Sequence, residues 1–220
     1  MNFFIPLPVR VPRFIKWWYP SWYIWDRKTN KKTVYLTFDD GPIPEVTEWV
    51  LDTLSRKRIP ATFFCIGDNV RKHPTIFKRL IAEGHSIGNH TFNHLKGWQT
   101  EDKTYLKNTH LADLEMRKHV DITPSELATN LFRPPYGKIK RAQAKALKKL
   151  GYKIIMYRVV AYDWESTITP EQCLENVIKN TRDGDIIVFH DSVKASENMK
   201  YALPKVIDHF LEHGFTFEKL

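Results

Sequence analysis

IIVFH, residues 186–190, is a run of four apolar side chains that ends in a histidine. A second run, IIM at residues 154–156, has the same apolar character. Strands that are apolar at every position are typical of parallel sheets covered on both faces. Amphipathic helical stretches separate these runs from other β-rich segments, as in folds where helices connect parallel strands. We therefore expect an α/β fold, a closed or nearly closed (β/α)7-type barrel with about seven parallel strands.

The expected strands are short segments rich in β-branched and aromatic residues. They cover residues 33–39, 61–66, 85–89, 131–133, 152–160, 186–190 and 215–218. Between them, apolar side chains recur at intervals of three and four residues, which predicts helices that turn one face to a core.

The composition is enough for one catalytic-sized domain, because 42% of the 220 residues are hydrophobic. The formal net charge is +9, but lysine and arginine are scattered along the expected helices rather than clustered with stacking aromatics. Proteins that bind nucleic acid show such clusters or a recognisable motif, so we expect no nucleic-acid partner.

Cysteine usage and the first residues bear on location. Cys65 and Cys173 are far apart, and burial as free thiols is the expected state of both. Prolines 6, 8 and 12 interrupt any apolar stretch long enough for a secretory signal. No segment is long enough to span a membrane. A cytoplasmic location is the default expectation, with a place beside a membrane as the alternative.

Residues 1–32 form an N-terminal arm that differs in kind from the expected catalytic domain, residues 33–220. Nine of the first 25 residues are aromatic, with prolines between them, so we expect neither strand nor helix there. Large aromatics usually serve burial, which predicts that the arm packs across the base of the barrel or closes an open seam. The alternative is weak contact with a membrane surface beside Arg10, Arg13 and Lys16.

Polar residues follow five of the expected strands at the point where each ends. These residues are Asp39 and Asp40, His90, Arg133, Asp163, and His190. The carboxyl ends of parallel barrel strands meet at one end of the barrel, where reactive groups collect. The sequence therefore predicts one site at that end.

A metal site is the first expectation for this end of the barrel. His90 and His94 are four residues apart, so one helical turn would place both imidazoles on one face. The adjacent carboxylates of Asp39 and Asp40 repel unless a cation or an acid–base role relieves them. Asp40 as a third ligand would leave coordination positions open for water and substrate. The same ligand types also describe the facial triad of non-haem iron oxygenases.

Five ordered motifs surround these residues. They are TFDDGP at 37–42, HTFNH at 90–94, RPPYG at 133–137, DW at 163–164 and VFHD at 188–191. In this order, over roughly residues 33 to 219, the chain resembles the polysaccharide deacetylases of the chitooligosaccharide deacetylase (NodB-homology) type, carbohydrate esterase family 4. The resemblance implies a distorted barrel of about seven strands. It also implies removal of N-acetyl, or alternatively O-acetyl, groups from an acetylated sugar polymer such as chitooligosaccharide, peptidoglycan or acetylxylan.

The resemblance also implies roles for individual residues. Asp39 is expected to be the general base, and Asp40, His90 and His94 to bind Zn²⁺ or a similar ion such as Co²⁺. His190 is expected to be the general acid that protonates the departing amine, since the ordinary pKa of histidine lies near the working range.

The remaining expected roles are positioning and substrate binding. Asp163 is expected to hold Arg133, which in turn holds the base in register. The backbone N–H of Tyr136 is expected to stabilise the oxyanion. Trp164 is expected to line the acetyl pocket, and Tyr136 and Val188 to contact substrate as well.

The chain departs from the family pattern in two regions. Tyr157 and Val160 stand where many members have a tryptophan and an acidic residue, and Asn93 replaces the serine common before the second histidine. A catalytically inactive glycan-binding barrel and an iron oxygenase remain the alternatives. The presence of base, ligands and acid together favours the hydrolase.

Overall fold

The computed structural model describes residues 8–27, 31–119 and 130–220, and within them nine strands form one parallel sheet. Its order is β1-β6-β5-β4-β3-β2-β8-β7, with β9 beside β2. The strands are β1 (Tyr23–Ile24), β2 (Thr33–Asp39), β3 (Thr62–Cys65), β4 (Ser86–Asn89), β5 (Leu131–Phe132), β6 (Lys153–Ile155), β7 (Val159–Val160), β8 (Ile186–His190) and β9 (Thr216–Phe217).

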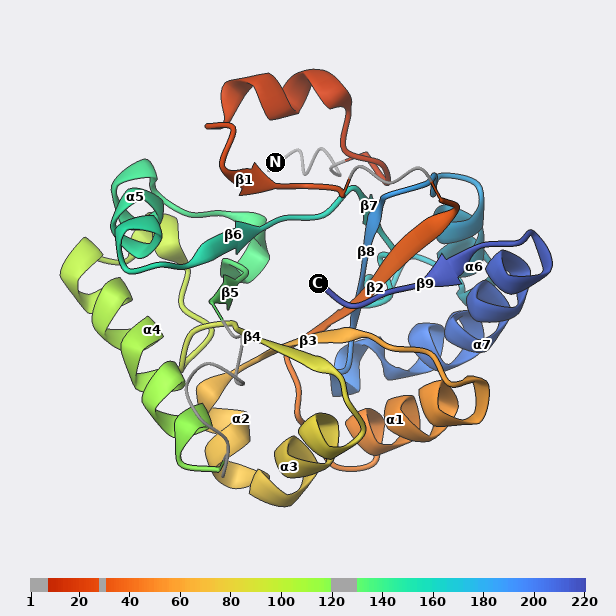
Figure 1. Ribbon diagram of the computed structural model, residues 1–220, viewed down its shortest axis with the longest axis horizontal. Helices are drawn as coiled ribbons and strands as arrows, with labels where there is room; N and C mark the ends of the chain where they lie inside the picture. Colours follow the sequence, from red (N-terminus) through yellow and green to blue (C-terminus); the bar gives the residue numbers. More distant parts are fainter. Residues whose placement is uncertain (1–7, 28–30, 120–129) are drawn as a thin grey trace.

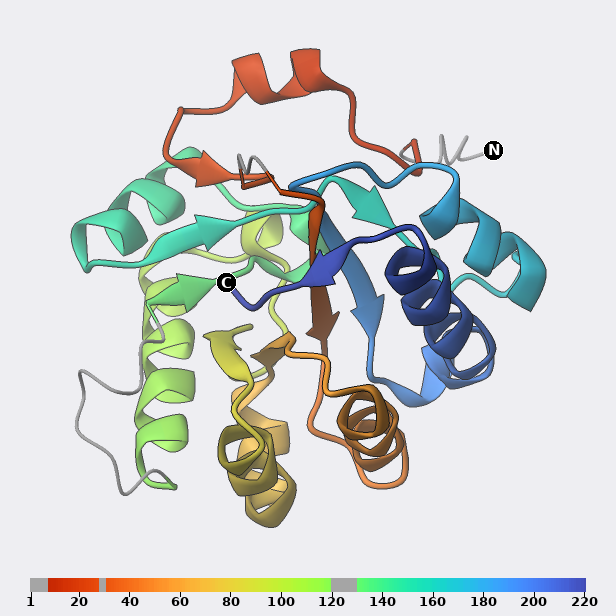
Figure 2. The same cartoon turned by 45° about the vertical axis from the view of Figure 1, so that its right-hand side comes forward.

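Helices surround the curled sheet on its outer side, as Figures 1 and 2 show from two directions. The α-helices are α1 (Val46–Lys57), α2 (Gly67–Lys72), α3 (Pro74–Ala82), α4 (Asp102–Arg117), α5 (Arg141–Lys149), α6 (Pro170–Ile178) and α7 (Ser196–Glu212). Short 3-10 helices are η1 (Arg13–Trp18), η2 (Gly97–Gln99), η3 (Pro135–Gly137) and η4 (Val193–Ala195). No helix in the described ranges combines the length and the apolar character needed to cross a bilayer.

The central strand β2 shows why the sheet is buried on both faces. Its alternate residues Val34, Leu36 and Phe38 belong to the large core cluster that includes side chains of α1 and α7. Tyr35, between them, joins an interior cluster with Ile186 and side chains from three more strands. All seven residues of β2 are buried, which confirms the α/β fold with a curled parallel sheet.

The strand count differs from the expected seven, in part because segment 152–160 is not one strand. It forms β6 and β7, which lie toward opposite ends of the strand order. In between, the Met156 N–H donates to the Ile24 carbonyl (2.7 Å), whereas the Arg158 N–H donates to the Ile186 carbonyl (2.9 Å). The pairing partner changes within three residues, and an apolar pattern does not reveal such a change.

The N-terminal arm contains regular structure, so the expectation of neither helix nor strand is wrong. It forms η1 and then β1, which pairs in parallel with β6. Before η1, the Val11 N–H donates to the Arg158 carbonyl (2.8 Å) and the Val160 N–H donates to the Val9 carbonyl (2.9 Å). The arm therefore lies along both β6 and β7 and bridges the seam between them, at the top of Figure 1.

Burial within the arm is uneven. Tyr23 and Trp25 are buried in the second core cluster, which is the packing expected of large aromatics. By contrast, Phe14, Trp17 and Trp18 of η1 are 55%, 84% and 85% exposed. The arm is thus part of the core at its strand and exposed at its helix.

Candidate metal centre and active site

The two strands at the centre of the site bring its expected acid and base side by side. β2 and β8 pair in parallel with Asp39 opposite His190, the last residue of each strand. Asp40 follows with φ 86, a conformation that costs energy for a residue other than glycine and is common at functional sites. The Asn69 amide secures this turn by donating to the Asp40 carbonyl (2.7 Å).

The three expected metal ligands are brought together. Oδ1 of Asp40 lies 3.3 Å from Nε2 of His94 and 3.7 Å from Nε2 of His90. One possible donor atom from each of the three residues lies within 4.8 Å of the other two. Three such donors leave one side of the group open, as catalytic metal sites require.

The histidines reach this geometry from a loop, so the expected helical turn is wrong. Thr91 and His94 have φ of 64 and 52, which interrupts any helix between the two ligands. Asn89 accepts from the Thr91 N–H (2.8 Å), and Asn108 of α4 accepts from the Asn93 N–H (3.0 Å). Asn93 in turn accepts from the Asn108 amide (2.8 Å), so this departure from the family pattern has a structural role.

The donor set fits a divalent cation. Oδ1 of Asp40 is buried and accepts no hydrogen bond from any described residue, which is costly for a carboxylate oxygen unless a cation compensates it. Nδ1 of His90 donates to the Arg133 carbonyl (2.8 Å), which leaves Nε2 unprotonated and directed to the site. Burial lowers the pKa of His90 and His94 to about 4, so both imidazoles are neutral near pH 7.

Asp39 is held by a fully buried arginine. Nη1 of Arg133 donates to Oδ1 of Asp39 and to Oγ1 of Thr37, both at 2.7 Å. The guanidinium also stacks over the Phe64 ring at 4.1 Å. Burial would raise the pKa of Asp39, but Arg133 and nearby histidines outweigh it, so the pKa lies below its ordinary value. Asp39 is therefore ionised.

Asp163 holds His190 and not Arg133, which corrects the expected chain of contacts. Oδ1 of Asp163 lies 2.9 Å from Nδ1 of His190, and Oδ2 accepts from the His190 backbone N–H (2.7 Å). Burial would lower the pKa of His190, but the Asp163 carboxylate overcomes this and raises it to about 9. Among the described residues, Arg133 instead donates to Thr37, Asp39 and the Met156 carbonyl.

Asp191 is a positioning residue to which the sequence argument assigned no role. Its Oδ1 accepts from the Gly41 N–H (3.0 Å) and its Oδ2 from the Thr47 hydroxyl (2.6 Å). A Cβ on Gly41 would lie 1.9 Å from Oδ2 of Asp191, so only glycine fits there. Burial raises the pKa of Asp191 to about 8. Its place after His190 in VFHD was the available signal.

The expected substrate-contacting residues lie around the metal ligands and His190. Tyr136 is 49% exposed, its ring lies 4.6 Å from the His94 ring, and its backbone has φ 60. Trp164 meets the His190 ring edge-on at 4.4 Å. Val188 is 1% exposed, in a cluster against which Trp164 packs, so it supports Trp164 from the core side.

Comparison with known proteins gives this arrangement a family. The family model described as polysaccharide deacetylase matches residues 26–155. The chain belongs to the polysaccharide deacetylase family. A peptidoglycan-N-acetylglucosamine deacetylase of Bacillus cereus is 35% identical over 201 residues, which cover 90% of this chain and 91% of the relative. A chitooligosaccharide deacetylase of Azorhizobium caulinodans is 32% identical over 170 residues, covering 76% of this chain and 78% of the relative.

Solved structures agree with this assignment to the polysaccharide deacetylases. The crystal structure of a peptidoglycan N-acetylglucosamine deacetylase, in complex with 4-naphthalen-1-yl-N-oxidanyl-benzamide, superposes with a TM-score of 0.85 at 30% identity. The match covers 96% of this chain and 95% of that one. The fold and family of this deacetylase-family chain are thereby shown over nearly its whole length.

Proposed function

We propose that the chain is a metal-dependent hydrolase that removes acetyl groups from N-acetylglucosamine units of a glycan. The observation that carries the proposal is the buried, unpartnered Oδ1 of Asp40 beside Nε2 of His90 and of His94. Zn²⁺ suits two imidazoles and one carboxylate, and Co²⁺ accepts the same ligands. The glycan class follows from relatives named for peptidoglycan and chitooligosaccharide.

Bound metal would polarise the acetyl carbonyl and make water easier to deprotonate. Asp39 then acts as the base that receives the proton of the attacking water. Arg133 occupies its Oδ1, which leaves Oδ2 as the accepting atom. The low pKa of Asp39 keeps this carboxylate ionised at neutral pH.

His190 acts as the acid for the departing amine. Nδ1 of His190 is bound to Asp163, so Nε2 carries the proton to be transferred. With its pKa near 9, the imidazolium is the main form at neutral pH. The backbone N–H of Tyr136, in the strained turn beside His94, serves the oxyanion that forms on attack.

The two alternatives leave features unused. An iron oxygenase would use the three ligands but give no role to Asp39 or to the His190–Asp163 pair. A glycan-binding barrel without catalysis gives no reason for the buried, unpartnered oxygen of Asp40.

Acetate release tests the proposal. Metal-free protein is supplied with Zn²⁺, Co²⁺ or no metal, in the absence of oxygen, and given chitooligosaccharides, peptidoglycan fragments or acetylxylan. We expect metal-dependent acetate release from the N-acetylated glycans and little from acetylxylan. Absence of acetate from every substrate, with metal demonstrably bound, would reject the hydrolase.

Two matched variants test the division of labour between the adjacent carboxylates. Asp39→Asn should retain stoichiometric metal, measured by elemental analysis, while turnover falls by at least about a thousandfold. Asp40→Asn should lose metal as well as turnover. The reverse pattern would show that the two roles are exchanged.

A further inference from the structure

A cavity lies at the other end of the barrel from the metal ligands. Asp185 and Arg158 line it, and they directly precede β8 and β7, whereas His190 ends β8. Asp185 and His190 are five positions apart along the strand, roughly 16 Å at about 3.3 Å per residue. The cavity has a volume of about 880 Å³, and we call it the basal pocket.

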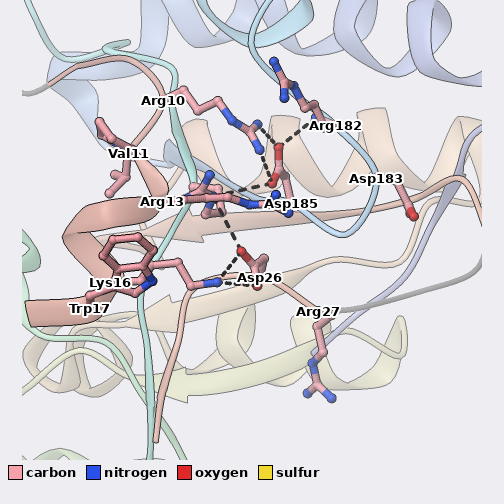
Figure 3. A pocket seen from close by; sticks show the side chains of 12 residues that line it. Arg10, Val11, Arg13, Lys16, Trp17, Asp26, Arg27, Arg182, Asp183 and Asp185 are labelled. Atoms are coloured by element: carbon pink, nitrogen blue, oxygen red, sulfur yellow. Dashed lines mark hydrogen bonds and ion pairs between the residues drawn. The ribbon is translucent and has the colours of Figure 1, made fainter. Parts of the chain in front are cut away.

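The basal pocket lies between the arm and the loop before β8, as Figure 3 shows. Lys16 and Trp17 of η1 form one wall, and Arg182 and Asp183 stand on the other side. Its lining is Arg10, Val11, Pro12, Arg13, Lys16, Trp17, Asp26, Arg27, Arg158, Arg182, Asp183 and Asp185. These side chains include six cations and three carboxylates, so the lining has an excess of three positive charges.

Internal ion pairs use only part of the positive charge. Arg10 pairs with Asp185 through both oxygens, and Nζ of Lys16 lies 2.7 Å from Oδ2 of Asp26. Arg13 and Arg182 are exposed, and within the described ranges neither guanidinium forms an ion pair. The pocket lining thus keeps two exposed guanidinium groups that are available to an anion.

Arg158 supplies the buried end of the pocket. Its side chain is 2% exposed, yet its Nε and Nη1 have no hydrogen-bond acceptor among the described residues. The nearest carboxylate oxygens to Nε belong to Asp26 at 3.6 Å and Asp185 at 3.8 Å, beyond hydrogen-bond distance. A buried guanidinium with unused donors is costly unless a ligand accepts from it.

We propose that the basal pocket binds the phosphoryl group of a phosphate ester or pyrophosphate. Five of its six cations are arginines, whose planar fork of donors matches phosphate oxygens in pairs. The excess of three charges suits an anion with more than one negative charge. The volume exceeds that of phosphate alone and is typical of organic ligands, and Trp17 offers the organic part an apolar wall.

Two probes test the pocket and distinguish a free ligand from a lipid headgroup. Binding of sodium pyrophosphate is measured by calorimetry at fixed ionic strength. Co-sedimentation is measured with vesicles of phosphatidylglycerol and, for comparison, of phosphatidylcholine. The test variant is Arg13→Gln/Arg182→Gln, which changes only exposed side chains of the pocket. The matched control is Lys145→Gln/Lys149→Gln, which removes the same charge from exposed positions of α5.

Saturable pyrophosphate binding that weakens at least tenfold in the test variant, and not in the control, supports the site and a free ligand. Sedimentation with phosphatidylglycerol alone, lost in the test variant only, supports the site and a lipid source. Binding of neither probe, or equal weakening in both variants, overturns the proposal. Acetate release should be unchanged in both variants, because the pocket lies at the other end of the barrel from the metal ligands.

Discussion

Replacing Asp163 by asparagine should make the activity of this deacetylase-family chain sensitive to mildly alkaline pH. The substitution keeps the shape of the side chain but removes the charge 2.9 Å from Nδ1 of His190. That carboxylate is the largest of the causes that raise the pKa of His190 from 6.5 to about 9, ahead of Asp40 and Asp39. If the pKa returns to its ordinary value, the protonated fraction at pH 8 falls from about 0.9 to about 0.03, roughly thirtyfold. At pH 6 the same change costs only about 1.3-fold.

The assay is kcat/KM for acetate release between pH 5.5 and 9.5, in wild type and Asp163→Asn. We expect the alkaline limb to move down by up to about 2.5 pH units in the variant. A loss of equal size at pH 6 and pH 8 would refute the reasoning, because it would mean that Asp163 only orients the ring. Glu165→Gln is the control, since it removes a nearby carboxylate that contacts Thr167 and not His190.

The pH dependence of stability tests the His190–Asp163 pair independently of activity. Because the folded-state pKa of His190 lies above its ordinary value, its protonation stabilises the fold fully below about pH 6.5. This contribution is lost as pH rises through about 9, and it amounts to at most about 3–4 kcal/mol. Urea unfolding of metal-free protein should therefore show a decrease in unfolding free energy over that window. An equal decrease in Asp163→Asn would contradict the assignment.

Three further perturbations have matched controls. Chelation by EDTA should lower the Tm of the wild type but not that of Asp40→Asn, since only the wild type loses a bound ion. Equal shifts in Tm would place the metal elsewhere. Gly41→Ala should lower the free energy of unfolding by more than about 2 kcal/mol, because the new Cβ would lie 1.9 Å from a buried carboxylate oxygen. In the control Gly84→Ala the Cβ meets no atom within 4 Å, so only the positive φ should cost about 1 kcal/mol. Similar losses in the two variants would refute the steric argument. Trp25 is 5% exposed, so Trp25→Ala should lower the free energy of unfolding in urea by about 3–5 kcal/mol. Trp17 is 84% exposed, so Trp17→Ala should cost less than about 0.5 kcal/mol. Equal costs would show that the arm is not part of the core.

The sequence predicts the parallel α/β fold because strands buried on both faces are recognisable as apolar runs. Residues 33–39 and 186–190 are apolar at most positions, and both strands have the predicted bounds. The division of segment 152–160 into two strands cannot be recognised in this way. The N–H groups of Met156 and Arg158 donate to different neighbouring strands, and every residue except proline has such a backbone donor. The pairing of β1 likewise depends on which edge remains open after the rest of the sheet has formed.

At the site, residue types and their place at strand ends predicted which side chains meet, but not which contacts they make. Asp163 and Arg133 both follow strands, and the sequence does not distinguish which of them faces His190. The Asn93–Asn108 pair joins a loop to α4 across 15 residues, and two asparagines at that spacing have no distinctive pattern. Thr47, which supports Asp191, is likewise an ordinary helical residue in the sequence.

The hydrogen bond between Val9 and Val160 joins two points about 150 residues apart in the chain. During vectorial synthesis, the arm leaves the ribosome before the barrel does, but its partner strands are made only after about two thirds of the barrel has been translated. Closing such a long loop has a high entropic cost, so docking of the arm should follow the formation of local helix–strand contacts. The arm is then the last segment to dock, and an intermediate that lacks it would expose the edges of β6 and β7 to intermolecular pairing.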